Sequence, residues 1–215
     1  MKAYTPPHSP NKEITLKFFV LFFLFFNLLA NAEENYSFRI AYGQASTNDF
    51  GNIISGNLGS HPQDLKVVAL DGGYLLKKDF FDLPIDLYVK GGFSYFDEEK
   101  NDDTYEALVY VKAIYNIDFL DNRVRFGLGE GVSYTTSILE AELYESDHDG
   151  GKTSHFLNYV DVSLDFDLGR LINYEAMRET YVGVLLKHRS GAFGLYNGVK
   201  DGGSNYNSVY LERNF

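Results

Sequence analysis

A histidine and a serine stand two positions apart near the C-terminus, within residues 179–190. Apolar and polar side chains alternate there, which predicts a β-strand with Lys187 and Arg189 on one face and His188 and Ser190 on the other. Residues i and i+2 of a strand lie about 6.6 Å apart, so the imidazole can approach the hydroxyl. Histidine can take the proton that makes a serine hydroxyl nucleophilic. The pair could therefore perform acyl transfer, or it could only hydrogen-bond to lipid headgroups or loop backbone.

The same alternation recurs along the chain, with turn-rich segments between the alternating runs. Successive side chains of a strand point to opposite faces, so each run predicts a strand with one polar and one apolar face. In the clearest run, residues 159–168, five apolar residues alternate with polar residues and a tyrosine. We expect eight strands, approximately at 35–45, 64–76, 84–96, 104–117, 122–136, 155–168, 179–190 and 204–215.

The fold class that this pattern predicts is all-β, an eight-stranded antiparallel transmembrane (outer-membrane) β-barrel. The strands are long enough for the roughly 9–11 tilted residues that cross a bilayer, and aromatic residues gather near their ends. Long polar connections alternate with shorter ones, as in such barrels. The interior is expected to be filled by side chains and too narrow for a general pore. The long connections, expected to face outward, are residues 46–63, 97–103, 137–154 and 191–203.

If Lys187 and Arg189 point into this barrel, His188 and Ser190 face the membrane near its extracellular rim. Glu130 also falls on the apolar face of its strand, where a carboxylate is costly. We expect a β-bulge near the neighbouring glycines to turn Glu130 inward, with a functional acid as the alternative.

The N-terminus has the features of an export signal. Lysines precede an apolar run from Phe18 to Leu29, and Ala30-Asn31-Ala32 follows. This order predicts a signal peptide over residues 1–32, cleaved after Ala32, and a single barrel domain over residues 33–215. The apolar run rises only about 18 Å as a helix, too short to span a bilayer.

The composition excludes several kinds of partner and chemistry. Residues 33–215 carry 16 basic and 29 acidic residues, a net charge of −13, which argues against nucleic acid as a partner. The chain has no cysteine, so thiol chemistry and disulfides are excluded. His148 and His155 lack a convincing third metal ligand, and we interpret the acidic runs at 97–103 and 145–151 as solvated loops. We therefore expect no metal and no cofactor.

The C-terminal sequence resembles a known family. From Lys187 to Tyr206 it reads KHRSGAFGLYNGVKDGGSNY, and a last strand ending in Phe215 follows. This segment is similar to the lipid A deacylase (PagL-like, acyloxyacyl hydrolase) family, whose members are eight-stranded outer-membrane barrels with a His-x-Ser pair on the penultimate strand. The resemblance implies hydrolysis of an ester-linked acyl chain of lipid A at the outer surface, with Ser190 as the nucleophile and His188 as the general base.

Two positions depart from the family pattern. The family has a glutamate at the position of Gly202, so the orienting acid would be the neighbouring Asp201, with Asn205 or Asn207 as the alternative. The family usually has asparagine directly after the serine, where this chain has Gly191, although exposed backbone N–H groups there could serve an oxyanion. The alternative function is a non-enzymatic surface barrel whose acidic extracellular loops bind an envelope or host partner.

Overall fold

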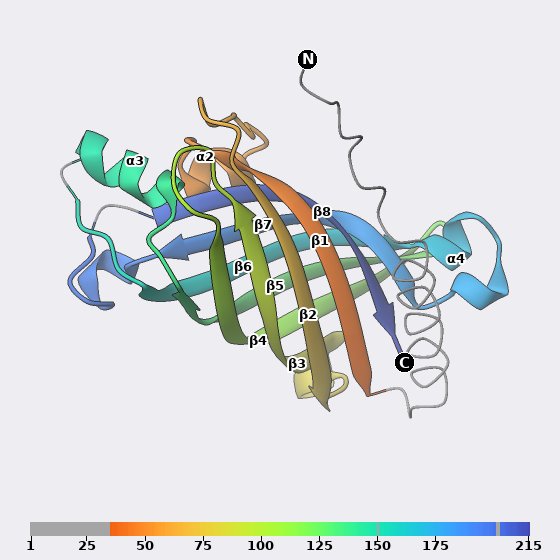
Figure 1. Cartoon of the computed structure of the whole chain (residues 1–215). Coiled ribbons are helices and arrows are strands. Elements are labelled where there is room, and N and C mark those ends of the chain that lie inside the picture. Colours follow the sequence, from red (N-terminus) through yellow and green to blue (C-terminus); the bar gives the residue numbers. More distant parts are fainter. Residues whose placement is uncertain (1–34, 150, 201–202) are drawn as a thin grey trace, which may run out of the picture. The chain divides into compact units, whose positions relative to one another are not determined.

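The computed structural model describes residues 35–149, 151–200 and 203–215. Residues 35–214 form one compact unit, a closed barrel of eight antiparallel strands in chain order, with β1 pairing with β8 (Figure 1). The predicted signal peptide and Asp201 lie outside the described residues. The strands are β1 (Tyr36–Ser46), β2 (Lys66–Lys77), β3 (Ile85–Asp97), β4 (Thr104–Phe119), β5 (Asn122–Thr135), β6 (Phe156–Asp167), β7 (Thr180–Ser190) and β8 (Gly203–Asn214).

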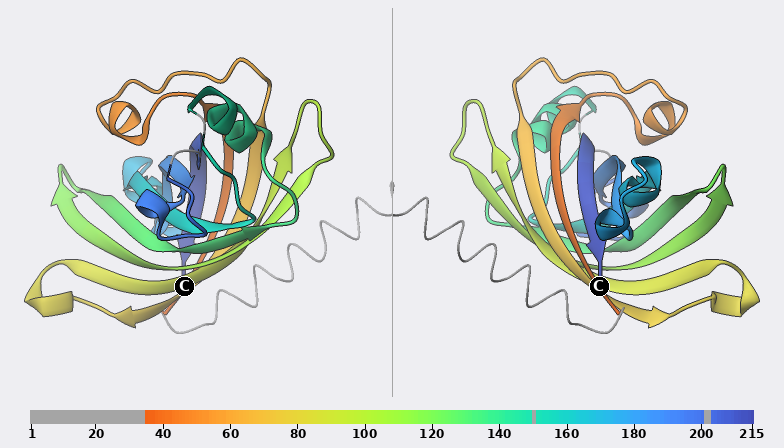
Figure 2. Two further views of the ribbon diagram at one scale, coloured as in Figure 1. Left: turned by 90° about the vertical axis from the view of Figure 1, so that its left-hand side faces the viewer. Right: turned by 90° about the vertical axis from the view of Figure 1, so that its right-hand side faces the viewer.

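The long connections contain short helices. At one end of the barrel lie α2 (Phe50–Ile54), α3 (Glu140–Asp149) and η3 (Ala192–Gly194), as the end-on view of Figure 2 (left) shows for α2 and α3. At the other end lie η1 (Phe80–Asp82), α4 (Leu168–Leu171) and η2 (Glu175–Met177). None of the helices among the described residues has the length and apolar character needed to cross a membrane.

The two faces of the sheet have opposite character, as the alternation predicted. On β4, for example, Val109 and Val111 are exposed on the outside, whereas Tyr110 and Lys112 are buried inside. A sheet that exposes its apolar face and buries its charged face is suited to lipid outside and a packed polar interior inside. We call the outward face of the strands the outer wall. Both the predicted strands and their facing are confirmed.

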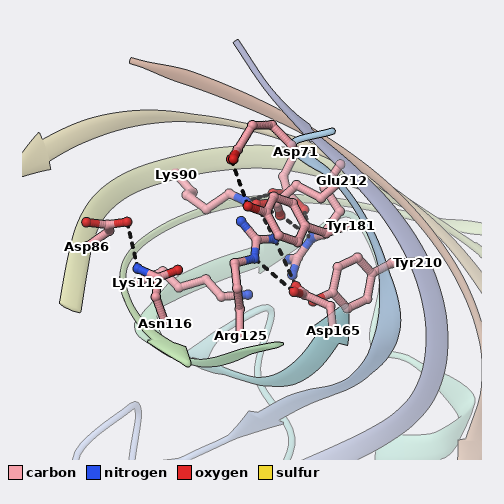
Figure 3. A network of polar contacts seen from close by, with 12 residues as sticks. Asp71, Asp86, Lys90, Lys112, Asn116, Arg125, Asp165, Tyr181, Tyr210 and Glu212 are labelled. Atoms are coloured by element: carbon pink, nitrogen blue, oxygen red, sulfur yellow. Dashed lines mark hydrogen bonds and ion pairs between the residues drawn. The ribbon is translucent and has the colours of Figure 1, made fainter. Parts of the chain in front are cut away.

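The interior is filled by paired charges (Figure 3). The guanidinium of Arg125 donates two hydrogen bonds of 2.8 Å to Asp165. The Lys90 ammonium lies 2.7 Å from Glu212 and 3.1 Å from Asp71. Because burying an unpaired charge is costly, this pairing is what allows so many ionised groups inside a narrow barrel.

The connection at 137–154 is not the polar loop that the sequence predicted. It contains α3, which lies at one end of the barrel (Figure 1), and Leu139 and Ala141 at its start pack among buried strand residues. Glu142 forms an ion pair with the inward-facing Arg189. Glu140 is also buried and accepts hydrogen bonds from the backbone N–H groups of Lys100 and Asn101. These long-range contacts order the segment, and local sequence does not encode them.

Stability is expected to fall as the pH rises toward neutrality, because of Glu98 just beyond β3. Its carboxylate accepts a hydrogen bond from the backbone N–H of Glu140 at the start of α3, at 2.9 Å. Burial, with Glu140 and Glu142 nearby, raises the pKa of Glu98 to about 7. The folded state therefore binds a proton that the unfolded state releases near pH 4.5, so stability is lost between about pH 4.5 and 7.

Urea unfolding of the purified barrel at pH 5 and pH 8 checks this expectation. The wild type should unfold at higher urea at pH 5, and Glu98→Gln should reduce the difference. Glu175→Gln, a replacement of an exposed carboxylate at the opposite end, is the control and should leave the difference unchanged. An unchanged difference in Glu98→Gln would show that Glu98 is not the responsible group.

Candidate functional site

Strand β7 places His188 and Ser190 on the outer wall. Lys187 and Arg189 are each 1% exposed inside the barrel, where both lie near Glu106. The neighbouring positions on the His188 side are apolar and face outward, with Val184 exposed. The predicted facing of the pair is therefore confirmed.

Asn205 fixes the orientation and tautomer of His188. The two residues are cross-strand partners on β7 and β8, and His188 Nδ1 lies 2.7 Å from Asn205 Oδ1. The Asn205 Nδ2 donates to the backbone carbonyl of Asn48 at 3.0 Å, which leaves its Oδ1 as the acceptor. Nδ1 of His188 must therefore carry the proton, and Nε2 keeps the lone pair that a general base needs.

The β1–β2 segment, residues 47–65, lies against the outer wall beside this pair. Two asparagines of β8 hold it there. Asn205 bonds to the carbonyl of Asn48, and Asn207 Nδ2 donates to the carbonyl of Leu58 at 2.8 Å. The Phe50 ring of α2 lies 5.0 Å from the His188 ring, centroid to centroid. The segment therefore partly covers the histidine and supplies part of its surroundings.

An apolar groove of about 730 Å³ lies on the outer wall. The described residues that line it reach along β7 to Leu186, two positions before His188, and include neither His188 nor Ser190. Ile53, Ile54 and Leu58 of the β1–β2 segment line one side of it. The wall side includes Leu186 and Val184, which are the outward residues that precede His188 along β7. This volume lies within the range of small-molecule sites, and the lining suits a hydrocarbon chain.

The chain turns sharply directly after Ser190. Gly191 has φ −80° and ψ 3°, and Ala192 and Phe193 have φ of 45° and 58°. A right-handed residue followed by a left-handed one turns successive backbone N–H groups toward one concave side, which favours an anion. A Cβ at position 191 would collide with the carbonyl oxygen of Val199, so the asparagine that is usual in the resembled family cannot be accommodated in this conformation.

Ser190 and His188 are not directly hydrogen-bonded in the described structure, and the Ser190 hydroxyl has no hydrogen-bond partner among the described residues. Catalytic hydrogen bonds often tighten only when substrate is bound. Of the predicted orienting groups, Asn205 contacts the histidine and Asn207 instead binds the β1–β2 segment.

The expectation for Glu130 was wrong. The pairing of β5 with β4 and with β6 continues without a register shift, so no bulge turns the side chain inward. Glu130 is exposed on the outer wall, opposite Val160, which in turn is opposite His188. Two strand spacings, about 10 Å, separate the backbones of Glu130 and His188.

Asn158 of β6 is an outward polar residue that was not predicted from the sequence, and it pairs directly with Ser190. Its position in the alternation, on the same face as Val160 and Val162, was the signal that could have identified it.

No family model and no curated protein matches the chain. Among solved structures, the outer membrane enzyme PagL is similar, with a TM-score of 0.55 and 12% identity over 83% of this chain and 99% of that one. Neisserial surface protein A (NspA) has a TM-score of 0.48 and 14% identity over 85% of this chain and 98% of that one. At this identity the likeness to PagL concerns the fold. The chain is an eight-stranded β-barrel with the architecture of outer-membrane proteins.

Proposed function

We propose that the protein is a serine esterase that removes an ester-linked acyl chain from lipid A. The observation that carries the proposal is the His188–Asn205 hydrogen bond on the outer wall, beside an apolar groove and within two residues of Ser190. A half-buried histidine held in one tautomer beside a serine is a catalytic arrangement. The resemblance of the C-terminal sequence to lipid A deacylases supplies the substrate class.

In the proposed reaction, Ser190 Oγ attacks the ester carbonyl carbon while His188 Nε2 takes the hydroxyl proton. The tetrahedral intermediate collapses, the bond to the sugar oxygen breaks, and His188 returns the proton to that oxygen. Water then attacks the acyl-serine ester, again with its proton passing to His188. Collapse releases the fatty acid and restores the Ser190 hydroxyl.

The placement of the site explains how this substrate would reach it. If the start of β1 and the end of β8 face the periplasm, the end that carries α2 and α3 lies at the outer leaflet. Lipid A would then arrive by lateral diffusion along the outer wall, and its acyl chain would occupy the groove below His188. The backbone N–H groups after Ser190 would face the oxyanion.

Covalent labelling of the purified barrel in detergent micelles tests the proposal. A long-chain alkyl p-nitrophenyl phosphonate should form a bond between phosphorus and Ser190 Oγ with release of p-nitrophenolate, and peptide mass mapping should locate the adduct. Ser190→Ala should remain unlabelled, whereas Ser146→Ala, which replaces a partly exposed serine on α3, should label like the wild type. Equal labelling of Ser190→Ala would contradict the proposal and favour the non-enzymatic surface barrel.

Removing the Asn205 side-chain oxygen, which accepts the hydrogen bond from His188 Nδ1, is expected to lower kcat without unfolding the barrel. A hydrogen bond to a charged group contributes about 1.5–3 kcal/mol, and the imidazolium that forms in the reaction would lose it. Asn205→Leu should therefore reduce kcat by about 10- to 100-fold. Asn205→Asp, which restores an acceptor, should be more active than Asn205→Leu. If both variants hydrolyse lipid A at the wild-type rate, Asn205 does not orient His188.

A further inference from the structure

Asn158 is a polar residue on the outer wall, where the neighbouring outward-facing side chains of β6 are apolar. Val160, Val162, Leu164 and Phe166 follow it on the same face of β6. Asn158 is nevertheless only 4% exposed, and its cross-strand partner on β7 is Ser190. The β-carbons of directly opposed residues are about 4.5–5.5 Å apart, so this amide is a direct neighbour of the Ser190 side chain.

The described part of the β7–β8 segment, residues 191–200, packs against the end of β6 where Asn158 lies. Asn197 Nδ2 donates to the carbonyl of Phe156 at 3.1 Å and to Ser154 Oγ at 2.8 Å. The Tyr196 and Phe156 rings lie 5.9 Å apart. These contacts place the turn after Ser190 beside the strand end that carries Asn158.

Asn158 makes no side-chain hydrogen bond with any described residue, and its Oδ1 is fully buried. The neighbouring Ser190 hydroxyl is also without a partner there. An unsatisfied buried polar group destabilises the folded state, and an apolar residue at position 158 would avoid this cost. Two polar groups that lie side by side on the outer wall without hydrogen-bond partners indicate a binding site whose missing partners are supplied by a polar ligand.

We infer that the Asn158 amide donates a hydrogen bond to the oxyanion that forms when Ser190 attacks the ester. This inference rests on the proposed function and adds a catalytic residue to it. An amide N–H aimed at the developing negative charge stabilises the transition state more than the ground state. Rotation of the amide about its terminal torsion directs either its oxygen or its NH₂ toward the substrate, so the group can supply a donor. Its N–H would supplement the backbone N–H groups after Ser190.

If Asn158 is an oxyanion donor, its replacement by an apolar residue should lower activity without lowering stability. Asn158→Leu removes an unsatisfied amide from a lipid-facing wall, so the barrel should be at least as stable as the wild type. The same change should lower kcat for lipid A hydrolysis by about 100- to 1,000-fold, the usual effect of losing one oxyanion donor. KM should change much less, because the interaction forms only in the transition state. A merely structural role would lower stability and leave kcat intact.

The test measures lipid A hydrolysis and urea unfolding of the purified full barrel in detergent micelles. Asn158→Leu and the nearly isosteric Asn158→Asp, which carries no N–H donor when ionised, should both lose kcat and remain folded. If Asn158→Leu fails to fold, the kcat of Asn158→Asp alone tests whether Asn158 donates to the oxyanion. Val111→Leu, on the outer wall of β4, is the matched control and should behave like the wild type.

The outcomes separate this inference from the proposed function. If the wild type is active, Ser190→Ala is inactive and both Asn158 variants keep kcat within about threefold, well short of the loss of an oxyanion donor, the proposed function stands and the role of Asn158 is overturned. A rise in KM with kcat unchanged would also overturn it. A folded wild type that does not hydrolyse lipid A would overturn the proposed function and this inference with it.

Discussion

Ser190→Ala is expected to abolish lipid A hydrolysis while the barrel stays folded. Removing the nucleophile of a serine hydrolase lowers kcat by roughly 10⁴- to 10⁶-fold, because no other group can form the acyl intermediate. The Ser190 hydroxyl makes no hydrogen bond with the described residues, so its removal leaves no protein group unpaired. Fatty acid release from lipid A by the purified variant, measured against time, checks the loss.

His188→Ala should cause a comparable loss, and the double variant should be no less active than either single variant. Residues that act in one chemical step are non-additive, because each is ineffective without the other. Retention of the heat-dependent shift in gel mobility by all three proteins controls for folding. Substantial activity in Ser190→Ala would show that another group carries the reaction, and independent, multiplying losses would show that the two residues do not act together.

Asp161→Ala is expected to destabilise the barrel by about 3–5 kcal/mol, because it leaves the buried Lys112 without an ion-pair partner among the described residues and takes one of its carboxylates from Arg39. Asp161 is fully buried inside, with its carboxylate 2.6 Å from Arg39 and 2.7 Å from Lys112. Its removal leaves two cations next to each other in a narrow interior. Urea unfolding of the barrel inserted in lipid vesicles measures the loss.

The matched control is Asp118→Ala, near the C-terminal end of β4. Asp118 is 61% exposed and lies 3.0 Å from Arg123. Solvated ion pairs contribute about 0.2–1 kcal/mol, so this variant should unfold close to the wild type. Equal losses for Asp118→Ala and Asp161→Ala would contradict the view that paired interior charges hold the barrel together.

The strands could be predicted from the sequence because one rule governs them all. Alternation sets which residues face lipid, and every observed strand end lies within two residues of its predicted position. On β7, the same rule predicts that Lys187 points inward and His188 outward, and both side chains lie on the predicted faces. The prediction needs only the two-residue alternation of apolar and polar side chains, which is a local property of the chain.

The features that could not be predicted from the sequence depend on contacts between segments that are distant along the chain. The packing of Phe50 against His188 and the placement of α3 follow from hydrogen bonds and buried contacts across the barrel end. Glu130 was predicted to turn inward because lipid disfavours charge, yet regular pairing on both sides keeps it outward. Asn205 could be named as an orienting group, but only the structure shows its bond to His188.

Mass spectrometry of lipid A from a Gram-negative host tests the central claim most directly. The host would express the wild type, Ser190→Ala or His188→Ala, each shown to be folded in the outer membrane. We predict that the wild type alone yields lipid A lighter by one ester-linked acyl chain. Unmodified lipid A with the wild type, both in cells and after incubation of the purified barrel with lipid A preparations of different acylation, would contradict the claim.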